Sequence, residues 1–314
     1  MKWLPLLSEY ITFAFKSLYA HKLRTFLTTL GVIIGVTTII TIFTTIEGLN
    51  SYVEENFTSI GGTNSIYISK NPWVMMDDWW KYRNRPKITI DDYYYLKKNS
   101  KEADYIAPVL ELMASAEYRN KSIQRVLVQA SNEDFLMANA LKLERGRFLT
   151  NLDFHSARQV VVIGAKVKEL LFKDQDPIGK VIKISGRHFK VIGVLAKRGS
   201  IFGFDMDKSV VVPYFAMRSV VGPRRGIDIT VAVKDPKNLQ KMKAEMRYLM
   251  RRHRKLKPSE PDNFSINQQD QLTDWYKQTT GTLYSIIFVI GSVSLLVGGI
   301  VITNIMLVSV TERT

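Results

Sequence analysis

Two long runs without a charged residue constrain this 314-residue chain more than any other feature. Residues 26–46 carry no charge over 21 positions, and residues 278–311 carry none over 34. Because a helix rises about 1.5 Å per residue, the first run would extend about 31 Å, close to the thickness of a bilayer's hydrocarbon core. We therefore predict transmembrane helices at 26–46 and within 278–310. The second run exceeds the bilayer, so part of it should form a stalk clear of the lipid.

A cleaved signal peptide is the alternative for the first run. A signal peptide's apolar region spans only 7–15 residues, and no A-x-A-like cleavage site follows this run, so we favour a membrane helix. The charges on its two sides predict its orientation. Basic residues predominate before the run and acids follow it closely (Lys2, Lys16, Lys22, Arg24 and Glu9 before; Glu47, Glu54 and Glu55 after). The positive-inside rule then places the N-terminus in the cytoplasm and residues 47–277 outside.

The parts of the chain around these runs have patterns of their own. Residues 1–25 gather apolar side chains near one helical face, which predicts an amphipathic helix at the cytoplasmic interface. The alternative is that this stretch is only a helical extension of the first membrane segment. Residues 47–277 alternate β-rich and helical stretches, which predicts an α+β extracytoplasmic domain of two lobes, with an inserted strand-rich lobe at about 131–225. The predicted strands are 65–69, 125–130, 160–163, 181–184, 189–195, 210–212, 227–233 and 264–267, and the predicted helices are 90–99, 165–172 and 238–254. The fold class is thus a membrane protein with two transmembrane helices flanking this domain.

The charge balance indicates which partners the outside domain can meet. Most of the formal net charge of +15 falls in residues 47–277. A domain outside the cytoplasm rarely meets nucleic acid, so we expect no nucleic-acid partner. Anionic lipid headgroups, lipopolysaccharide or an acidic partner protein fit this field better.

Residues typical of catalysis are sparse. The four histidines are scattered, the chain has no cysteine, and no G-x-S-x-G motif is present. Gly179-Lys180 lacks the earlier glycine and the following Ser or Thr of a phosphate-binding loop. A metal site needs three or four converging ligands, which this pattern does not offer. We expect no catalytic residue, no metal and no cofactor, and therefore a chain that is not an enzyme.

Small residues four positions apart occur in both uncharged runs. Gly31 and Gly35 form a G-x-x-x-G pair in the first run, and Ser294 and Gly298 form a similar pair in the second. Such pairs let a second helix approach closely, so we predict helix packing at these four residues. The alternative is that glycine is simply frequent in membrane helices.

A tryptophan-rich stretch, residues 71–86, interrupts the domain. Trp73, Trp79 and Trp80 lie there with two methionines and flanking prolines, in what the composition predicts to be a loop. Such a loop could offer an adaptable surface to a partner, and these tryptophans are the candidate residues for that surface. The alternative is that the rings fold back onto the domain.

Several segments together resemble MacB-like ABC transporter permeases, a family that includes FtsX-like and lipoprotein-releasing permeases. The segments, in the family's order, are "HKLRTFLTTLGVIIGVTTII", "LKLERGRFLT", "VVVIGAKVKELLFKDQDPIGKVIKI", "FKVIGVLAKRG", "VVVPY" and "VGGIVITNIMLVSVTERT". The resemblance covers nearly the whole chain. It implies a non-catalytic permease of the bacterial inner membrane that acts as a dimer with a cytoplasmic ABC ATPase on another chain. It also implies mechanotransmission: ATP-driven movement reaches the outside domain and there drives efflux through an adaptor and outer-membrane channel, lipoprotein extraction or control of cell-wall hydrolases.

The end of the sequence bears on this expectation. In relatives, "SVTERT" is followed by a basic cytoplasmic segment and two more membrane helices. We therefore expect residues 311–314 to begin a cytoplasmic segment of a truncated permease, with Glu312 and Arg313 at the start of coupling to the ATPase. The alternative from another class is a two-span membrane sensor with an outside ligand-binding domain, which would continue into a signalling module.

Overall fold

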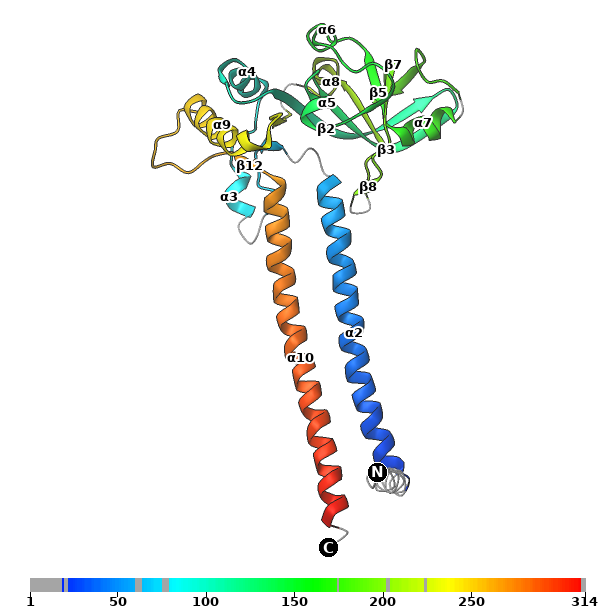
Figure 1. Ribbon diagram of the computed structural model, residues 1–314. Helices are drawn as coiled ribbons and strands as arrows, with labels where there is room; N and C mark the ends of the chain where they lie inside the picture. Colours follow the sequence, from blue (N-terminus) through cyan, green and yellow to red (C-terminus); the bar gives the residue numbers. More distant parts are fainter. Residues whose placement is uncertain are drawn as a thin grey trace, which may run out of the picture. The chain divides into compact units, whose positions relative to one another are not determined.

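The computed structural model describes residues 19, 22–59, 64–74, 79–173, 175–201, 204–222 and 225–311 (Figure 1). The chain divides into two compact units. One unit comprises Met1–Tyr52 and Tyr276–Thr314, and the other comprises Val53–Trp275. Most of the predicted amphipathic helix at 1–25 lies outside the described residues, as do Glu312 and Arg313.

A ten-stranded sheet forms the frame of the Val53–Trp275 unit, in the order β12-β1-β11-β2-β3-β10-β5-β7-β4, with β6 paired to β2 and β7. The strands are β1 (Ser65–Ser69), β2 (Tyr105–Tyr118), β3 (Lys121–Ser131), β4 (Leu143–Gly146), β5 (Val160–Ile163), β6 (Val181–Ile184), β7 (Arg187–Leu195), β10 (Ser209–Pro213), β11 (Asp228–Ala232) and β12 (Ser265–Asn267). A separate hairpin pairs β8 (Ser200–Ile201) with β9 (Phe204–Asp205).

Strand β2 joins the two halves of this sheet. Its first part, from Tyr105 to Val109, pairs antiparallel with β11. Its second part pairs with β3 from Leu110 onward and with β6 at Ala116 and Glu117. Strand β2 therefore belongs to both halves of the sheet.

Helices cover both faces of the sheet to different extents. They are α3 (Trp79–Arg83), α4 (Ile90–Asn99), α5 (Phe135–Ala138), α6 (Asn151–His155), α7 (Ala165–Phe172), α8 (Tyr214–Val221), the 3₁₀ turn η1 (Pro236–Asn238) and α9 (Leu239–His253). The larger core includes residues of α4, α7, α8 and α9, whereas a smaller core on the other face includes α5. Within β5, Val161 and Ile163 enter the larger core and Val162 enters the smaller one. This alternation of side chains along a strand is why an apolar run can be buried on both faces.

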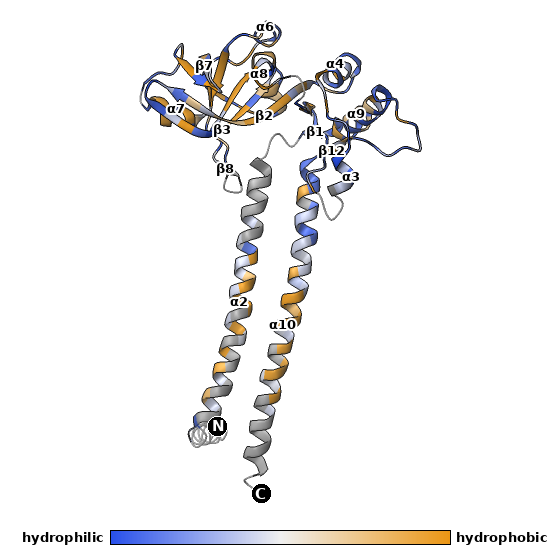
Figure 2. Ribbon diagram, turned by 180° about the vertical axis from the view of Figure 1, so that it is seen from behind, coloured by the Kyte–Doolittle hydropathy of each residue, from blue (hydrophilic) through white to orange (hydrophobic). Residues whose placement is uncertain are grey.

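Two long helices, α2 (Lys22–Ser59) and α10 (Gln269–Thr311), contribute the other unit through their parts up to Tyr52 and from Tyr276. Within this unit they lie side by side (Figure 1). Among the described residues, one helical stretch, Gln269–Ile300 of α10, is long and apolar enough to cross a membrane. The corresponding apolar stretch of α2, Gly35–Gly48, is shorter. Figure 2 shows apolar residues along the middle of α10 and polar residues in its first turns.

Candidate functional site

The edge strand β12 and its neighbour β1 connect the domain to both long helices along the chain. Helix α2 ends at Ser59, shortly before β1 begins at Ser65, and β12 ends at Asn267, just before α10 begins at Gln269. The two strands pair antiparallel with each other, with Tyr67 opposite Asn267.

Asn267, which is 1% exposed, is the centre of a buried hydrogen-bond cluster at this edge. Its Nδ2 donates to Ser69 Oγ at 2.7 Å and to the carbonyl oxygen of Asn71 at 3.1 Å. Its Oδ1 accepts from the backbone N–H of Trp73 at 3.1 Å. A buried amide satisfied on both sides holds its partners in one geometry, because losing any of these bonds would leave a buried polar group unpaired. Asn267 thus fixes the segment that follows β1 to the end of β12, two residues before α10 begins.

The start of α10 is fixed in the same way by Gln268, which is also buried. Its Oε1 accepts from Lys243 Nζ of α9 at 2.8 Å, and its Nε2 donates to Asp270 Oδ2 at 2.7 Å. Gln271 Nε2 donates to the carbonyl oxygen of Ile266 in β12 at 3.3 Å. The first turn of α10 is therefore bonded to β12 through Gln271 and to Gln268, which in turn is bonded to α9.

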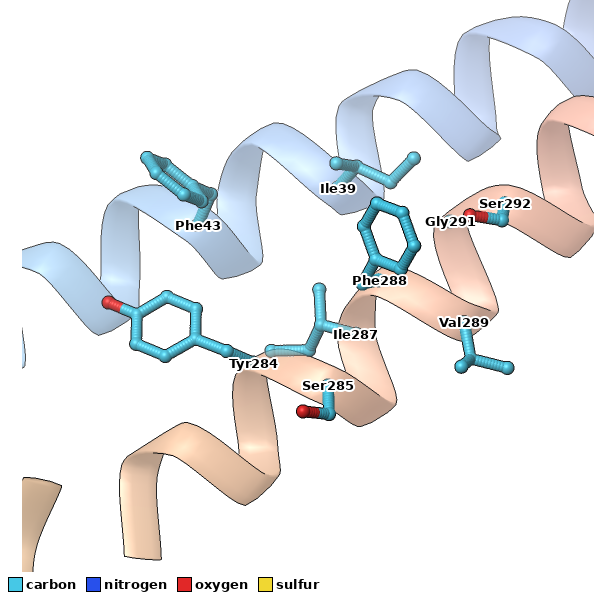
Figure 3. Close-up of a pocket in the computed structure, with 9 residues that line it drawn as sticks. All are labelled: Ile39, Phe43, Tyr284, Ser285, Ile287, Phe288, Val289, Gly291 and Ser292. Atoms are coloured by element: carbon cyan, nitrogen blue, oxygen red, sulfur yellow. The ribbon is translucent and has the colours of Figure 1, made fainter. Parts of the chain in front are cut away.

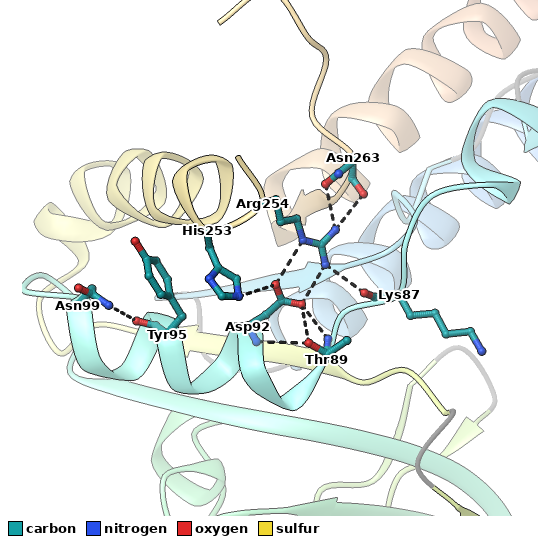
Figure 4. A network of polar contacts seen from close by, with 8 residues as sticks. All are labelled: Lys87, Thr89, Asp92, Tyr95, Asn99, His253, Arg254 and Asn263. Carbon is teal, nitrogen blue, oxygen red and sulfur yellow. Dashed lines mark hydrogen bonds and ion pairs between the residues drawn. The ribbon is translucent and has the colours of Figure 1, made fainter. Parts of the chain in front are cut away.

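A second cluster, centred on Asp92 and Arg254, holds α4 and α9 together (Figure 4). Asp92 closes a capping box at the start of α4, where its carboxylate accepts from the backbone N–H of Thr89 at 2.8 Å. The same carboxylate accepts from Arg254 Nη2 at 3.0 Å and from Nε at 3.3 Å. The Arg254 and Asp92 side chains are only 9% and 5% exposed, so this is a buried, doubly bonded ion pair.

Arg254 extends this cluster toward β12. Its Nη1 donates to Asn263 Oδ1 at 2.9 Å, and its Nη2 donates to the carbonyl oxygen of Lys87 at 3.1 Å. Next to it, the His253 ring stacks on Tyr95 with ring centres 4.3 Å apart (Figure 4). The start of α4, the end of α9 and the approach to β12 are thereby joined into one block.

The predicted tryptophan surface separates into two parts. The Trp73 ring packs against Tyr67 with ring centres 4.8 Å apart. This ring therefore folds back onto the domain, as the alternative interpretation of the stretch expects. Burial raises the pKa of Tyr67 to about 12, with opposing effects from Arg198 and Glu111, so its hydroxyl stays protonated at physiological pH. Trp79 and Trp80 begin the short helix α3, and the Trp80 side chain is 54% exposed.

The two long helices contact each other around Gly291 of α10. A Cβ atom on Gly291 would lie 3.1 Å from Ile39 Cδ1 of α2, and the rings of Phe43 and Tyr284 meet edge-to-face at 6.4 Å. These residues line an apolar groove of about 610 Å³ (Figure 3). The predicted packing residues Gly35 and Gly298 are half-buried. Packing at Gly31, Gly35, Ser294 and Gly298 remains a prediction.

Ionisable residues do not gather into a metal centre in the described part of the chain, where no three or more His, Asp or Glu side chains form a group able to hold a metal ion. His155 and His188 are exposed, His253 belongs to the Asp92 cluster, and His21 lies outside the described residues.

The clusters centred on Asn267 and on Asp92 and Arg254 were not predicted from the sequence. The pattern T-x-x-D, present at Thr89–Asp92 and again at Thr150–Asp153, is a capping-box signature and could have located the starts of α4 and α6. No local pattern announces Asn267 or Arg254, because their partners lie far away in the sequence.

The structure combines a mixed α/β domain with two long helices, one of which has a stretch long and apolar enough to cross a membrane. Comparison with known proteins identifies the family. Residues 25–249 match the family described as MacB-like periplasmic core domain. The chain therefore belongs to the MacB-like family of ABC transporter permeases.

Relatives from Neisseria meningitidis and Bacillus subtilis agree with this assignment. The Macrolide export ATP-binding/permease protein MacB of Neisseria meningitidis is 35% identical over 305 residues, which cover 95% of this chain and 45% of that protein. The uncharacterized ABC transporter permease YknZ of Bacillus subtilis is 29% identical over 315 residues, covering 98% of this chain and 76% of that protein. The chain thus spans about half the length of the MacB proteins that it matches.

Two solved structures share the fold of the domain. The periplasmic region of MacB from Actinobacillus actinomycetemcomitans has a TM-score of 0.57 at 23% identity and covers 72% of this chain and 97% of that one. The extracellular domain of the transporter YknZ from Gram-positive bacteria has a TM-score of 0.51 at 20% identity and covers 65% of this chain and 99% of that one.

Proposed function

We propose that this chain is the permease, or the N-terminal part of the permease, of a MacB-type ABC transporter that works by mechanotransmission. ATP hydrolysis takes place on a separate cytoplasmic chain. Helices α2 and α10 cross the membrane and carry the resulting movement to the domain outside, where it drives export or extraction of a substrate. The chain itself is not an enzyme in this proposal, and it acts as a dimer.

The observation that carries the proposal is the pairing of β1 with β12. The two strands adjoin the two long helices along the chain, and they hydrogen-bond to each other through Tyr67 to Ser69 and Ser265 to Asn267. A helix satisfies its backbone hydrogen bonds internally, so it can move as a rigid body. A movement delivered to this strand pair would reach α9 through Lys243 and Gln268.

The exposed apolar side chains of α10 support the membrane part of the proposal. Phe288, Leu296 and Ile300 are 76%, 67% and 67% exposed. Contiguous apolar surface of this kind is normally covered by lipid or by other helices. Placement of residues 47–277 on the side of the membrane away from the cytoplasm rests on the charges flanking the first uncharged run.

The family assignment favours a permease over the two-span sensor. The relatives at 35% and 29% identity are named as a macrolide export ATP-binding/permease protein and as an ABC transporter permease. The expected partners are accordingly a cytoplasmic ABC ATPase and a second permease copy. A periplasmic adaptor and an outer-membrane channel are further expected partners if the cell has an outer membrane.

A flexible insertion in α10 tests mechanotransmission. Two glycines inserted after Asp274 would interrupt the helix before the uncharged run, because glycine is a poor helix former. The protein carrying this chain would be reconstituted with its ATPase, and spin labels at Leu152→Cys on the two copies would report their separation by double electron–electron resonance. We expect ATP trapping with vanadate to change the separation in the parent and leave it unchanged in the insertion variant, with ATPase activity retained.

A matched control carries the two glycines after Ala157, in the exposed turn that follows α6. This control should behave like the parent. An ATP-driven change that survives the α10 insertion would contradict transmission through α10. If no coupling between two labels were detected in the parent, the proposed dimer would be wrong.

A further inference from the structure

Helix α3 has an unusual composition for its position in the domain. Its five residues, Trp79–Arg83, read WWKYR, with Lys81 and Arg83 in its last turn. Trp80 is 54% exposed, and both basic side chains are exposed as well. Two aromatic types that favour the membrane–water interface are thus combined with two cations in one turn and a half of helix.

The segment that carries α3 is fastened at both ends to β12. At its start, Asn267 binds the backbone of Asn71 and Trp73. At its end, Arg85 Nη1 donates to Ser265 Oγ at 2.8 Å, and the Arg85 guanidinium lies 4.6 Å from the centre of the Tyr82 ring.

A further bond closes the segment on itself, since Lys70 Nζ donates to the carbonyl oxygen of Arg83 at 2.7 Å. Both views show α3 beside the first turns of α10 within the same unit (Figures 1 and 2). Helix α3 is therefore held close to the point at which α10 leaves the sheet.

The continuity of α10 sets the distance from this point to the lipid. The helix runs unbroken from Gln269. Its long uncharged run begins at Gln278, about 14 Å further along the helix axis. Trp275, 40% exposed, lies between these two positions. A tryptophan just before an apolar helix is typical of the headgroup layer. Only ten residues of the chain therefore separate the end of β12 at Asn267 from the start of the long uncharged run at Gln278.

We propose that α3 is a membrane-surface contact that binds anionic lipid headgroups on the outer side of the bilayer. Trp80 inserts its ring at the interface, and Lys81 and Arg83 interact with headgroup phosphates. The charge of α3 and its attachment beside the membrane-entering end of α10 favour lipid over a protein partner. The contact rests on the proposed membrane insertion of α10, and it would give the domain a second point of support besides the helices.

Depth measurements on the full chain in nanodiscs of phosphatidylglycerol and phosphatidylcholine test this proposal. The chain has no cysteine, so a spin label can be placed at Trp80→Cys alone, with Arg83→Cys as a second site if the first variant misfolds. We expect relaxation by oxygen to be enhanced, and relaxation by a water-soluble nickel complex to be reduced, relative to Leu152→Cys. Leu152 is 56% exposed and lies in α6, at the opposite end of the same unit from α3 (Figure 1).

Equal nickel accessibility at positions 80 and 152 would overturn the proposal. Protection of position 80 from both oxygen and nickel would also overturn it, because that result indicates a protein contact. A label at Leu296→Cys, in the middle of the apolar stretch, distinguishes failure of the α3 contact from failure of the membrane insertion of α10. If position 296 lies deep in the bilayer and position 80 in water, only the α3 contact is wrong. If position 296 is itself in water, the membrane insertion of α10 is wrong too.

Charge removal tests the headgroup chemistry. The double variant Lys81→Gln/Arg83→Gln should weaken the contact roughly fivefold for each basic residue and abolish its dependence on phosphatidylglycerol. Lys98→Gln/Lys101→Gln removes the same charge from two other exposed positions of the domain and should leave the depth at position 80 unchanged. An equal effect of the two double variants would show that general charge, and not α3, binds the lipid.

Discussion

At the scale of single residues, two buried carboxylates hold helix starts to the rest of the domain. Asp92 and Asp153 each occupy the third position of a capping box, with Thr89 and Thr150 as the caps. Each also binds an arginine: Asp92 pairs with Arg254, and Asp153 with Arg147 at 2.6 Å. One carboxylate thereby satisfies the backbone of a helix end and neutralises a cation, which a neutral side chain of the same shape cannot do.

Replacing Asp92 with asparagine should strongly destabilise the domain. The change leaves Arg254, 9% exposed, without its charged partner, and breaking a buried ion pair in this way costs about 3–5 kcal/mol. Pulse proteolysis in urea would measure the loss. Asp91→Asn, at the exposed neighbouring position, should change stability by less than about 1 kcal/mol and serves as the control. Equal midpoints for the two variants would contradict the role of the Asp92 cluster.

Asp153 should make the stability of the domain depend on acid pH. Burial opposes its ionisation, but hydrogen bonds from Arg147 and Thr150 outweigh this and lower the pKa of Asp153 below its ordinary value of 3.8. Because the folded state holds the ionised form more tightly, the stabilisation is present above about pH 4 and is lost as the pH falls through the lower folded pKa. Pulse proteolysis between pH 7 and pH 2 should show a shallower acid dependence in Asp153→Asn. An unchanged slope would count against this assignment.

At the scale of elements, the two long helices approach each other closely at a small residue. Gly291 of α10 faces Ile39 of α2, and a Cβ at Gly291 would come within 3.1 Å of the Ile39 side chain. Sequence spacing predicted Gly31, Gly35, Ser294 and Gly298 as packing residues. Packing at those four residues stays a prediction.

Substituting Gly291 with leucine should separate the two helices. The added side chain cannot occupy the space taken by Ile39, so the disulfide yield between Phe43→Cys and Tyr284→Cys should fall severalfold in membranes. Gly299→Leu is the matched control, because no atom lies within 4 Å of a Cβ at Gly299. Equal cross-linking in the two variants would rule out a close approach at Gly291. Leucine at both Gly31 and Gly35 should impair helix association if the spacing prediction is right.

At the scale of the whole molecule, the proposed function depends on which side of the membrane the domain occupies. A single cysteine at Lys121, at the start of β3, should react in intact spheroplasts with a reagent that cannot cross membranes. Protection of this position until the cells are lysed would place the domain in the cytoplasm and overturn the proposed topology. A cysteine at Lys16 should show the opposite behaviour and provides the control.

Much of the local structure could be predicted from the sequence. The predicted strands 65–69, 160–163 and 181–184 coincide with β1, β5 and β6, and the predicted helices 90–99 and 165–172 coincide with α4 and α7. Strand β2 was missed. It contains Pro108 together with alanines and glutamates, which are depleted in strands, so its composition conceals a strand that tertiary pairing stabilises.

The candidate site could not be predicted in the same way. Asn267 lies 198 residues from Ser69, and Arg254 lies 162 residues from Asp92. The tryptophan stretch was recognised as unusual, yet only the structure separated Trp73, packed on Tyr67, from Trp80, exposed on α3.

The sequence by itself determined where many of the helices and strands form, where the chain carries long apolar runs, and which family it resembles. These properties depend on neighbouring residues, through charge-free length, side-chain periodicity and capping patterns. Only the tertiary structure decided that β1 pairs with β12, that Asp92 binds Arg254 and that α3 lies beside the start of α10. Such contacts join residues far apart in the chain, and their selection depends on packing and on the closure of the intervening loops, which no local pattern encodes.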